Sequence, residues 1–399
     1  MKVLQVVPHI GEESSGPSYS VPGLCRGLAE NGVETRLSFL GKVPERLKGE
    51  KYKAISYPQH DKLNLGWSPE MLRGLREACR TADIIHSNSL WMMPNVYPAW
   101  AVKGTKCKLV VAPRGTLAAW SLEKGWLKKK IFGWLLQNQV LRCADMFHAT
   151  SEKEYEEIRA AGYKQPVAIV PIGMDIPCGN EVKVRGEGEQ RFYRVVFFGR
   201  LHKVKAVDRL IQAWELLTKE QEVDLHSSTS TSNFNSITNW ELVIAGPDGG
   251  IRGELEQYIA AHKIPRVRFV GEINGPAKYE FLSAADLYVL PSFTENFGVT
   301  VAEALACGTP AIVSKGTPWQ GVGDNHCGWW VENDLETLAK TLREAMALSD
   351  EERRLMGENG KEWIRRDFTW EGVGAKMKAA YEWLVKPDRA IRPDFIRID

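Results

Sequence analysis

Short apolar runs rich in β-branched residues alternate along the chain with segments of helical composition. The first run is Lys2–Val7, the segment Tyr19–Gly32 then has the composition of a helix that ends on a glycine, and Val33–Leu40 is a second run. This succession of strand, loop, helix and strand is typical of a parallel α/β domain. The first half of the chain predicts four more strands, at Asp83–Ser87, Lys108–Ala112, Met146–Ser151 and Val167–Gly173.

The alternation stops at Cys178–Gln190, a polar and glycine-rich segment typical of a linker. Beyond it, Ala206–Leu217 and Trp370–Val385 predict helices, and Leu225–Asn239, rich in Ser, Thr and Asn, predicts a mobile surface loop. The second half predicts strands at Tyr193–Gly199, Trp240–Gly246, Val267–Gly271, Asp286–Ser292 and Ala311–Ser314.

Two domains are expected because 399 residues exceed one ordinary hydrophobic core. The pattern predicts an α/β protein of two Rossmann-like, doubly wound domains that face a central cleft. Residues 1–182 form the first predicted domain and residues 183–369 the second. The C-terminal helix, in residues 370–399, is expected to pack back on the first domain.

The composition is that of a soluble globular protein, with 44% apolar and 26% charged residues. The net charge of +2 gives no general attraction to nucleic acid. Residues 1–180 contain 24 Lys and Arg against 17 Asp and Glu, whereas residues 181–399 contain 28 against 33. The basic half suggests a domain that faces an anionic surface or substrate, although chance and solvated faces explain the difference equally well.

The cysteines and the N-terminus indicate a cytoplasmic protein. The seven cysteines include no CxxC pair, which favours a reducing compartment and argues against a zinc site or a disulfide framework. The N-terminal segment lacks the apolar core of a signal peptide, and no stretch reaches the roughly 20 apolar residues of a spanning helix. The sequence contains no Asp-x-Asp motif, so no metal cofactor is expected.

The segment Thr294–Pro310 (TENFGVTVAEALACGTP) follows a predicted buried strand. Gly308–Pro310 are helix stop signals, so Val299–Cys307 predicts a short helix. Phe293–Gly298 is then a loop at the carboxyl end of a strand, which is where open α/β sheets bind ligands.

Two glutamates flank a predicted anion site in this segment. The N–H groups around Asn296–Val299 have no helical partner and point outward. Glu295 lies in the loop beside them, and Glu303 lies about one turn into the helix. This arrangement suits a ligand with phosphates and hydroxyls, such as a sugar nucleotide. A capping glutamate and a solvent-facing helix glutamate are the alternative interpretation.

Two more segments follow predicted strands and carry residues suited to phosphate. Gly199 permits a tight exit from its strand, and Arg200 and Lys205 are then placed to clamp a diphosphate, unless they are ordinary surface cations. Gly16 follows the first strand, where a glycine lets the backbone approach a phosphate. This loop does not match GxGxxG and is a weak signal alone.

Together these segments resemble glycosyltransferase family 4, a family of retaining, nucleotide-sugar-dependent enzymes with the GT-B fold. The resemblance covers nearly the whole chain, and its most specific element is the E-x7-E block from Glu295 to Glu303. Other segments resemble the family's diphosphate-binding block at Phe197–Ile211, donor-domain loops at Ala245–Gly250 and Phe269–Gly275, the exit from the N-terminal domain at Ile169–Asp175, and a segment of members that build bacterial surface polysaccharides at Gly316–Val331.

The resemblance implies a role for each matching residue. Arg200 and Lys205 become the diphosphate clamp, Glu303 the acceptor for the ribose hydroxyls, and Glu295 the partner of the donor sugar's hydroxyls. The other donor-binding residues that it implies are the backbone of Asn296, Phe297, Gly298 and Val299, the N-terminal loop glycine Gly16, and the loop residues Gly199, Gly246, Gly271, Glu272 and Ile273.

This chain departs from the family at three places. Many relatives have two glycines where it has Ser15-Gly16, and Lys-Gly where it has Lys205-Ala206. Many also have a histidine near the acceptor where it has Arg114. Arg114 or His86 is a candidate to replace that histidine, with Asn88 beside them on the acceptor side, and a buried, merely hydrogen-bonded His86 is the alternative.

The resemblance implies a retaining hexosyltransferase of bacterial surface polysaccharide biosynthesis, such as that of lipopolysaccharide. Its second domain would bind a UDP- or GDP-linked sugar and its first a glycan or lipid-linked acceptor, without a cofactor. Glu295, Arg200, Lys205 and Arg114 are the expected catalytic residues. The alternatives are a sugar-nucleotide epimerase or hydrolase of the same fold, and a non-catalytic protein that binds sugar nucleotides.

One segment of the basic half suggests a membrane surface. Glu123–Cys143 combines Lys124, Lys128, Lys129 and Lys130 with apolar residues at helical spacing. A basic amphipathic helix is typical of peripheral binding to anionic lipid, so we expect binding to the inner face of the cell membrane. A core-facing helix with a solvated lysine face is the alternative.

Overall fold

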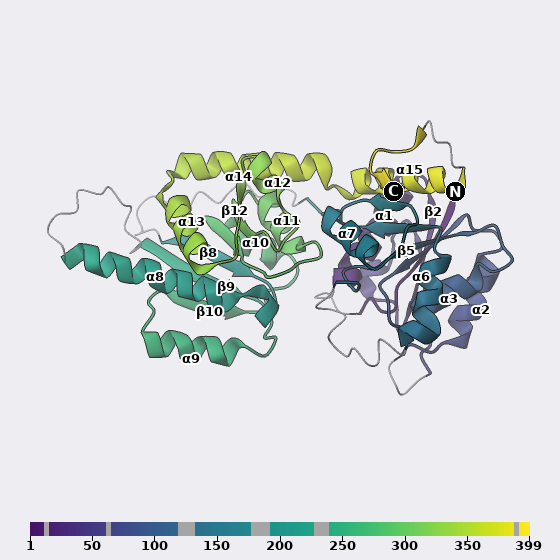
Figure 1. The fold of residues 1–399 in the computed structure, drawn as a ribbon, viewed down its shortest axis with the longest axis horizontal. Helices are drawn as coiled ribbons and strands as arrows, with labels where there is room; N and C mark the ends of the chain where they lie inside the picture. Colours follow the sequence, from purple (N-terminus) through teal and green to yellow (C-terminus); the bar gives the residue numbers. More distant parts are fainter. Residues whose placement is uncertain (12–15, 61–64, 119–131, 177–191, 227–238, 387–390) are drawn as a thin grey trace. The chain divides into compact units, whose positions relative to one another are not determined.

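The computed structural model describes the chain except for residues 12–15, 61–64, 119–131, 177–191, 227–238 and 387–390 (Figure 1). The described residues form two compact units. Unit 1 comprises Met1–Asp175 and Asp367–Asp399, and unit 2 comprises Ile176–Arg366.

Unit 1 is built on an eight-stranded sheet with the order β14-β7-β6-β5-β4-β1-β2-β3. Its strands pair in parallel except β14, which is antiparallel to β7. Every residue of β4 is buried, as expected for a strand in a sheet that is covered on both faces. The strands are β1 (Lys2–Val6), β2 (Glu34–Leu40), β3 (Lys53–Tyr57), β4 (Ile84–Asn88), β5 (Lys108–Ala112), β6 (Met146–Ala149), β7 (Val167–Ile169) and β14 (Ile396–Arg397).

The helices of unit 1 connect successive strands, and the last of them comes from the C-terminal part of the chain. They are α1 (Gly16–Glu30), the 3₁₀ turn η1 (Glu45–Leu47), α2 (Pro69–Ala78), α3 (Met93–Ala101), the π-helix η2 (Gly133–Gln137), α6 (Asn138–Cys143), α7 (Glu152–Ala160) and α15 (Trp370–Val385).

Helices α1 and α15 approach closely because glycines lie where they meet. A Cβ atom at Gly27 would lie 2.0 Å from the carbonyl oxygen of Trp370. A Cβ atom at Gly374 would lie 2.3 Å from the backbone of Gly27. The C-terminal helix is therefore fitted to the first helix of unit 1 by the absence of side chains at these positions.

Unit 2 is built on a six-stranded sheet with the order β10-β9-β8-β11-β12-β13, and its pairs are all parallel. Its strands are β8 (Tyr193–Phe198), β9 (Trp240–Ala245), β10 (Val267–Gly271), β11 (Leu287–Leu290), β12 (Ala311–Ser314) and β13 (Gly328–Val331). Its helices are the 3₁₀ turn η3 (Lys203–Lys205), α8 (Val207–His226), α9 (Arg252–His262), α10 (Ala277–Ser283), α11 (Val299–Ala306), α12 (Gly321–Asp324), α13 (Leu335–Ala347) and α14 (Asp350–Asp367).

Each sheet contains a topological switch point between two neighbouring strands. In unit 2 the chain runs outward from β8 through β9 to β10 and then returns to β11 on the other side of β8. In unit 1 it runs outward from β1 through β2 to β3 and returns to β4 on the other side of β1. Ligands of doubly wound sheets bind beyond the carboxyl ends of the strands at such points.

The predicted α/β architecture of two doubly wound sheets is confirmed, with differences in detail. The sequence did not predict β3, β13 or β14, and β3 is partly exposed along its length, so it lacks a buried apolar run. Helix α8 continues to His226, so Leu225 and His226, predicted as the start of a loop, are helical. The rest of that predicted loop and the predicted linker Cys178–Gln190 lie outside the described residues.

Candidate functional site

The loops that follow β8 and β11 lie at the switch point of unit 2 and are joined to each other. The Phe293 N–H, after β11, donates to the Val204 carbonyl oxygen, after β8, at 2.9 Å. Lys205 Nζ forms an ion pair with Glu295 Oε1, and Ser292 Oγ donates to the same oxygen at 2.7 Å. The structure therefore brings together Lys205 and Glu295, which the sequence placed in separate motifs.

The backbone around this ion pair is tightly specified. The Glu295 N–H donates to the Gly316 carbonyl oxygen at 3.0 Å, which fixes the loop against the segment after β12. Ala206 has a φ of +51°, in the left-handed region that glycine adopts without strain. This left-handed conformation favours glycine, which many family members have where this chain has Ala206.

Arg200 also follows β8 but is exposed. Among the described residues it forms no ion pair, so its guanidinium is available to a ligand. The loop beneath it packs on the turn after β9, where a Cβ atom at Gly249 would lie 2.6 Å from the Leu201 carbonyl oxygen.

Helix α11 begins at the switch point with a glycine in a left-handed conformation. Gly298 is its N-cap, with a φ of +79°. In the described part of the chain, the N–H groups of Gly298, Val299 and Thr300 have no hydrogen-bond acceptor. These N–H groups lie where the sequence predicted an anion site, and a helix dipole favours negative charge at such a terminus. The Phe297 side chain is buried, and the backbone carbonyl oxygen of Phe297 accepts from Trp319 Nε1 at 2.5 Å. The Phe297 side chain is therefore part of the hydrophobic core.

Glu303 lies in α11 and is only 4% exposed. Lys278 Nζ, from α10, contacts its Oε1 at 2.5 Å. Burial lowers the pKa of Lys278, but the Glu303 carboxylate more than offsets this effect, and the pKa is raised above its usual value. Lys278 was not predicted from the sequence, because the pair joins two helices and no local spacing relates its members.

Three glycines allow close backbone contacts between the loops that follow β8, β9 and β10. The Gly246 N–H donates to the Gly271 carbonyl oxygen at 2.7 Å, and a Cβ atom at Gly246 would lie 1.9 Å from the Gly199 carbonyl oxygen. Glu272 is exposed and Ile273 half-buried directly after β10. The predicted donor loops thus lie at the carboxyl ends of β8, β9 and β10, the strands next to one another in the sheet.

In unit 1, a chain of polar side chains runs beneath the switch point of β1 and β4. Tyr381 OH, from α15, accepts from Gln5 Nε2 at 3.0 Å, and Gln5 Oε1 accepts from Asn88 Nδ2 at 2.9 Å. Arg114 Nε and Nη2 both donate to Asn88 Oδ1, at 3.3 and 3.0 Å. The structure therefore joins Asn88 and Arg114, two of the three predicted acceptor-side candidates.

His86, the third candidate, is fully buried behind this chain. Its Nδ1 lies 2.7 Å from Tyr381 OH, and its ring lies 5.2 Å from that of His148. Burial, and then the charges of His148 and Arg114, lower the pKa of His86, while burial and Arg114 lower the pKa of His148 to about 3. Both imidazoles are neutral and inaccessible, which favours the structural alternative for His86.

The remaining predicted features lie apart from these groups or outside the described residues. Gly16 is the first residue of α1, and nothing described lies within 4 Å of the position of a Cβ atom there. Residues 123–131 of the basic segment Glu123–Cys143, which include its four lysines, lie outside the described residues. Within the described ones, no helix is long and apolar enough to cross a membrane, and no cluster of His, Cys, Asp or Glu forms a metal site.

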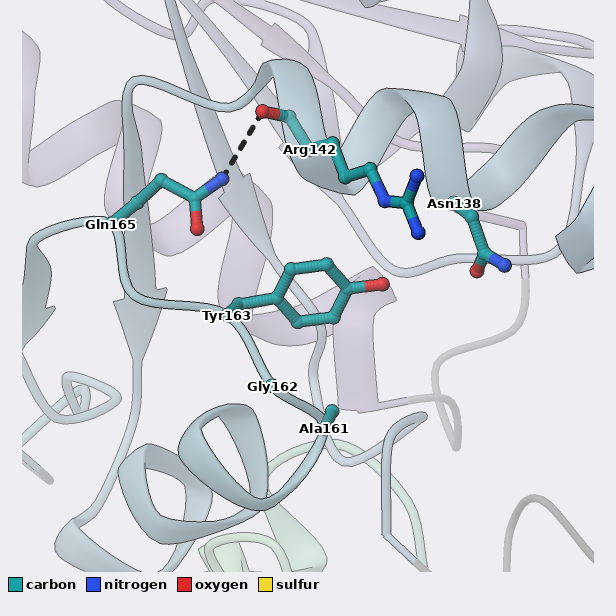
Figure 2. Close-up of a pocket in the computed structure, with 6 residues that line it drawn as sticks. All are labelled: Asn138, Arg142, Ala161, Gly162, Tyr163 and Gln165. Atoms are coloured by element: carbon teal, nitrogen blue, oxygen red, sulfur yellow. Dashed lines mark hydrogen bonds between the residues drawn. The ribbon is translucent and has the colours of Figure 1, made fainter.

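A polar pocket of about 360 Å³ lies elsewhere on unit 1 (Figure 2). Figure 2 shows the guanidinium of Arg142 above the hydroxyl of Tyr163, with Gln165 turned away to bond the Arg142 carbonyl oxygen at 3.2 Å. Asn138, Ala161 and Gly162 complete the lining. None of the predicted site residues lines this pocket.

Two family models match the chain, one in each half. The model described as "Glycosyl transferase 4-like domain" matches residues 15–173, and the model described as "Glycosyl transferases group 1" matches residues 182–363. The second match contains the groups at the switch point of unit 2.

Similar proteins include D-inositol 3-phosphate glycosyltransferases. The one from Jonesia denitrificans is 31% identical over 193 residues, which are 47% of this chain and 42% of the relative. The one from Salinispora tropica is 28% identical over 349 residues, which are 80% of this chain and 68% of the relative. The first of these matches therefore spans less than half of that relative's length.

Solved structures share the fold at low sequence identity. Sucrose-phosphate synthase from Thermosynechococcus elongatus has a TM-score of 0.72 at 20% identity, covering 97% of this chain and 100% of that one. The Anabaena protein Alr3699/HepE, in complex with UDP and glucose, has a TM-score of 0.71 at 16% identity, covering 96% and 99%. With both halves matched by family models and these folds shared, the chain belongs to the glycosyltransferases of family 4, which have the GT-B fold.

Proposed function

We propose that this protein is a retaining hexosyltransferase that moves a sugar from a UDP- or GDP-sugar to a glycan or lipid-linked acceptor. It acts in bacterial surface polysaccharide biosynthesis, in the cytoplasm or at the inner face of the membrane. The observation that carries the proposal is the group at the switch point of unit 2. There the Lys205–Glu295 ion pair, the exposed Arg200 and the N-terminus of α11 lie at the carboxyl ends of β8 and β11, where a doubly wound sheet binds its ligand.

The leaving diphosphate accumulates negative charge as the glycosidic bond breaks. Arg200, Lys205 and the N–H groups at the start of α11 are three sources of positive potential for this charge. The hydrogen bond from the Phe293 N–H to the Val204 carbonyl oxygen holds the loop of Lys205 against the loop that leads into α11, so this part of the site needs little reorganisation in the transition state. No metal is required in this scheme.

The two glutamates differ in what they can reach. Glu295 lies between Lys205 and Ser292 and is assigned to the hydroxyls of the donor sugar. Glu303, one turn into α11, is assigned to the ribose hydroxyls. The acceptor attacks from the face that the diphosphate leaves, and the departing phosphate takes its proton. No separate base is then needed, in agreement with the burial of His86 and His148.

A panel of sugar nucleotides tests this proposal through the melting temperature. A ligand that binds only the native state stabilises it by about 2.7 kcal/mol when its concentration is 100 times its Kd. We expect one UDP- or GDP-sugar to raise the melting temperature, and expect it to lose its sugar to an acceptor when a cell-envelope extract is added.

Two variants test whether the thermal shift depends on the proposed site or on positive charge in general. Arg200→Gln should abolish the thermal shift, whereas Lys203→Gln should retain it, because Lys203 is an exposed cation of the same loop without an ion pair among the described residues. A shift that survives Arg200→Gln, or hydrolysis of the sugar nucleotide without transfer, would contradict the proposal.

A further inference from the structure

The guanidinium of Arg114 is fixed on one side and open on the other. Its Nε and Nη2 donate to Asn88 Oδ1, and this amide cannot turn over, because Asn88 Nδ2 is committed to Gln5 Oε1 at 2.9 Å. Within the described residues, Nη1 has no acceptor. The chain of buried amides therefore holds a guanidinium in one orientation and leaves one of its edges unused.

The charge of Arg114 has no carboxylate partner in the part of the chain that the structure describes. The nearby Glu154 is committed elsewhere, since Oε1 accepts from the Gly115 N–H at 2.7 Å and Oε2 accepts from the N–H and hydroxyl of Thr150 at 2.7 and 2.8 Å. Burial lowers the pKa of Arg114 by more than the charge of the nearby Glu154 raises it, so the cost of keeping this cation away from water is only partly offset. An unpaired, partly buried cation disfavours folding, so a ligand is its natural partner.

The backbone around Arg114 is strained in the way that binding sites are. Ser89, Trp91 and Arg114 have φ values of +75°, +72° and +56°, although none is a glycine. The three residues follow β4 and β5 at the edge where the switch point lies. Their loops are bound together, because the Ser89 N–H donates to the Ala112 carbonyl oxygen at 2.8 Å. Such strain persists where the surrounding structure enforces it, most often at ligand sites.

We propose that Arg114, oriented by Asn88, binds an oxyanion of the acceptor, so that the acceptor is an acidic or phosphorylated sugar. This inference rests on the proposed function, because it assigns unit 1 to the acceptor. A guanidinium presents two parallel N–H groups that match a carboxylate or a phosphate ester equally well. The shared chemistry is therefore an oxyanion, and two sources of it remain to be separated by experiment.

Side-chain NMR of the full chain labelled with ¹⁵N-arginine tests the inference directly. The probes are inorganic phosphate, acetate and neutral acetamide, and the spectrum of Arg114→Met identifies the Arg114 signal by its loss. Arg142 is the internal control, because it is an exposed guanidinium of the same unit without an ion pair among the described residues (Figure 2).

We expect the Arg114 signal to titrate with phosphate or acetate at concentrations about 10-fold or more below those that shift Arg142, as for a hydrogen bond to a charged group. Acetamide should shift neither signal. A preference for phosphate identifies a phosphate ester, and a preference for acetate identifies a carboxylate. If Arg114 responds no more strongly than Arg142, or responds equally to acetamide, the inference is wrong.

Melting temperatures measured with and without inorganic phosphate separate anion binding from a purely structural role for Arg114. Arg114→Met removes both donors to the buried Asn88 Oδ1, so its melting temperature without phosphate should be lower, and phosphate should raise it less than it raises that of the unchanged protein. Arg114→Lys should retain a weakened phosphate response, and an equal phosphate shift in Arg114→Met and the unchanged protein would overturn the inference. The binding of sugar nucleotides is measured separately from the anion response of Arg114. If no sugar nucleotide binds but Arg114 still responds to anions, the proposed function is contradicted and the inference about Arg114 is not.

Discussion

At the scale of residues, the two glutamates of the E-x7-E block occupy different electrostatic settings. Glu303 is almost fully buried and paired with Lys278, whereas Glu295 is paired with Lys205 beside the proposed diphosphate. In the proposed function, the first setting is remote from the breaking bond and the second adjoins it. Their removal should therefore affect different kinetic constants.

Glu303→Gln should mainly raise the KM for the donor, because contacts to the ribose are alike in the ground and transition states. A hydrogen bond to a charged group contributes roughly 1.5–3 kcal/mol, so the expected factor is about 10- to 150-fold.

Glu295→Gln should mainly lower kcat, by at least as much, because it also releases Lys205 from its partner. Steady-state kinetics with varied donor measure both. A pure KM effect in Glu295→Gln, or loss of turnover at saturating donor in Glu303→Gln, would reverse the roles.

Lys278 should prove important for stability, although the sequence gives no sign of it. Lys278→Met leaves the buried Glu303 carboxylate without its lysine partner and should cost about 3 kcal/mol of unfolding free energy. The double variant Lys278→Met/Glu303→Gln should recover most of this loss, since the buried charge is then gone. Urea unfolding of the two single variants and the double variant measures the coupling. Additive losses would show that the two side chains act independently.

Charge neutralisation by side chains makes a prediction about metal. Arg200 and Lys205 both follow β8, and in the proposed function they and α11 supply the positive potential that a divalent cation supplies elsewhere. EDTA should therefore leave turnover nearly unchanged. The control is the same assay with added magnesium or manganese. If chelation removes most of the activity and either metal restores it, the residues assigned to the diphosphate are insufficient.

At the scale of elements, the close approach of α1 and α15 depends on glycine. Gly27→Ala places a Cβ atom 2.0 Å from the Trp370 carbonyl oxygen, and backbone cannot move aside as a flexible side chain can. Overpacking of this kind costs about 1–3 kcal/mol, which exceeds the gain of roughly 0.5–1 kcal/mol from alanine in a helix. The melting temperature should fall by about 2–4 °C for each kcal/mol.

Gly253→Ala is the matched control for this variant. Gly253 lies in α9, and nothing lies within 4 Å of the position of its Cβ atom, so alanine should be neutral or stabilising there. Equal melting temperatures for Gly27→Ala and Gly253→Ala would contradict the prediction, because α15 would then shift away from α1 without a loss of stability.

The elements also show why the sequence predicted some features and missed others. Buried parallel strands such as β5 and β11 consist almost entirely of apolar residues, so the strand ends and the site residues that follow them could be predicted from the sequence. Strand β3 is partly exposed and has no such run. The pairs Lys205–Glu295 and Lys278–Glu303, and the chain from Tyr381 to Arg114, join distant segments, and only the folded sheets bring them together.

At the scale of the whole molecule, the uneven charge of the chain bears on where it works. Residues 1–180 carry an excess of Lys and Arg, and residues 181–399 an excess of Asp and Glu. Such a division orients a protein near a charged surface, because one half is attracted while the other is repelled. A lipid-linked acceptor presented at an anionic membrane would be met by the basic half.

The protein should therefore sediment with vesicles that contain anionic lipid and remain in solution with neutral ones. The segment Glu123–Cys143 supplies the lysines, and Leu135, within it, is 56% exposed on the described part of that segment. Each lysine near an anionic surface contributes about 1 kcal/mol, so replacing three of them with glutamine should weaken binding about 100-fold. The lysines to replace are Lys128, Lys129 and Lys130.

Replacing three exposed lysines of unit 2 controls for net charge alone. If the attraction belongs to the basic segment, this control variant should sediment like the unchanged protein, and added salt should weaken the binding of both in parallel. Equal sedimentation with neutral and anionic vesicles, or none with either, would contradict the prediction. An equal loss in the two triple variants would instead assign the effect to overall charge. The lysines of the control are Lys219, Lys263 and Lys340.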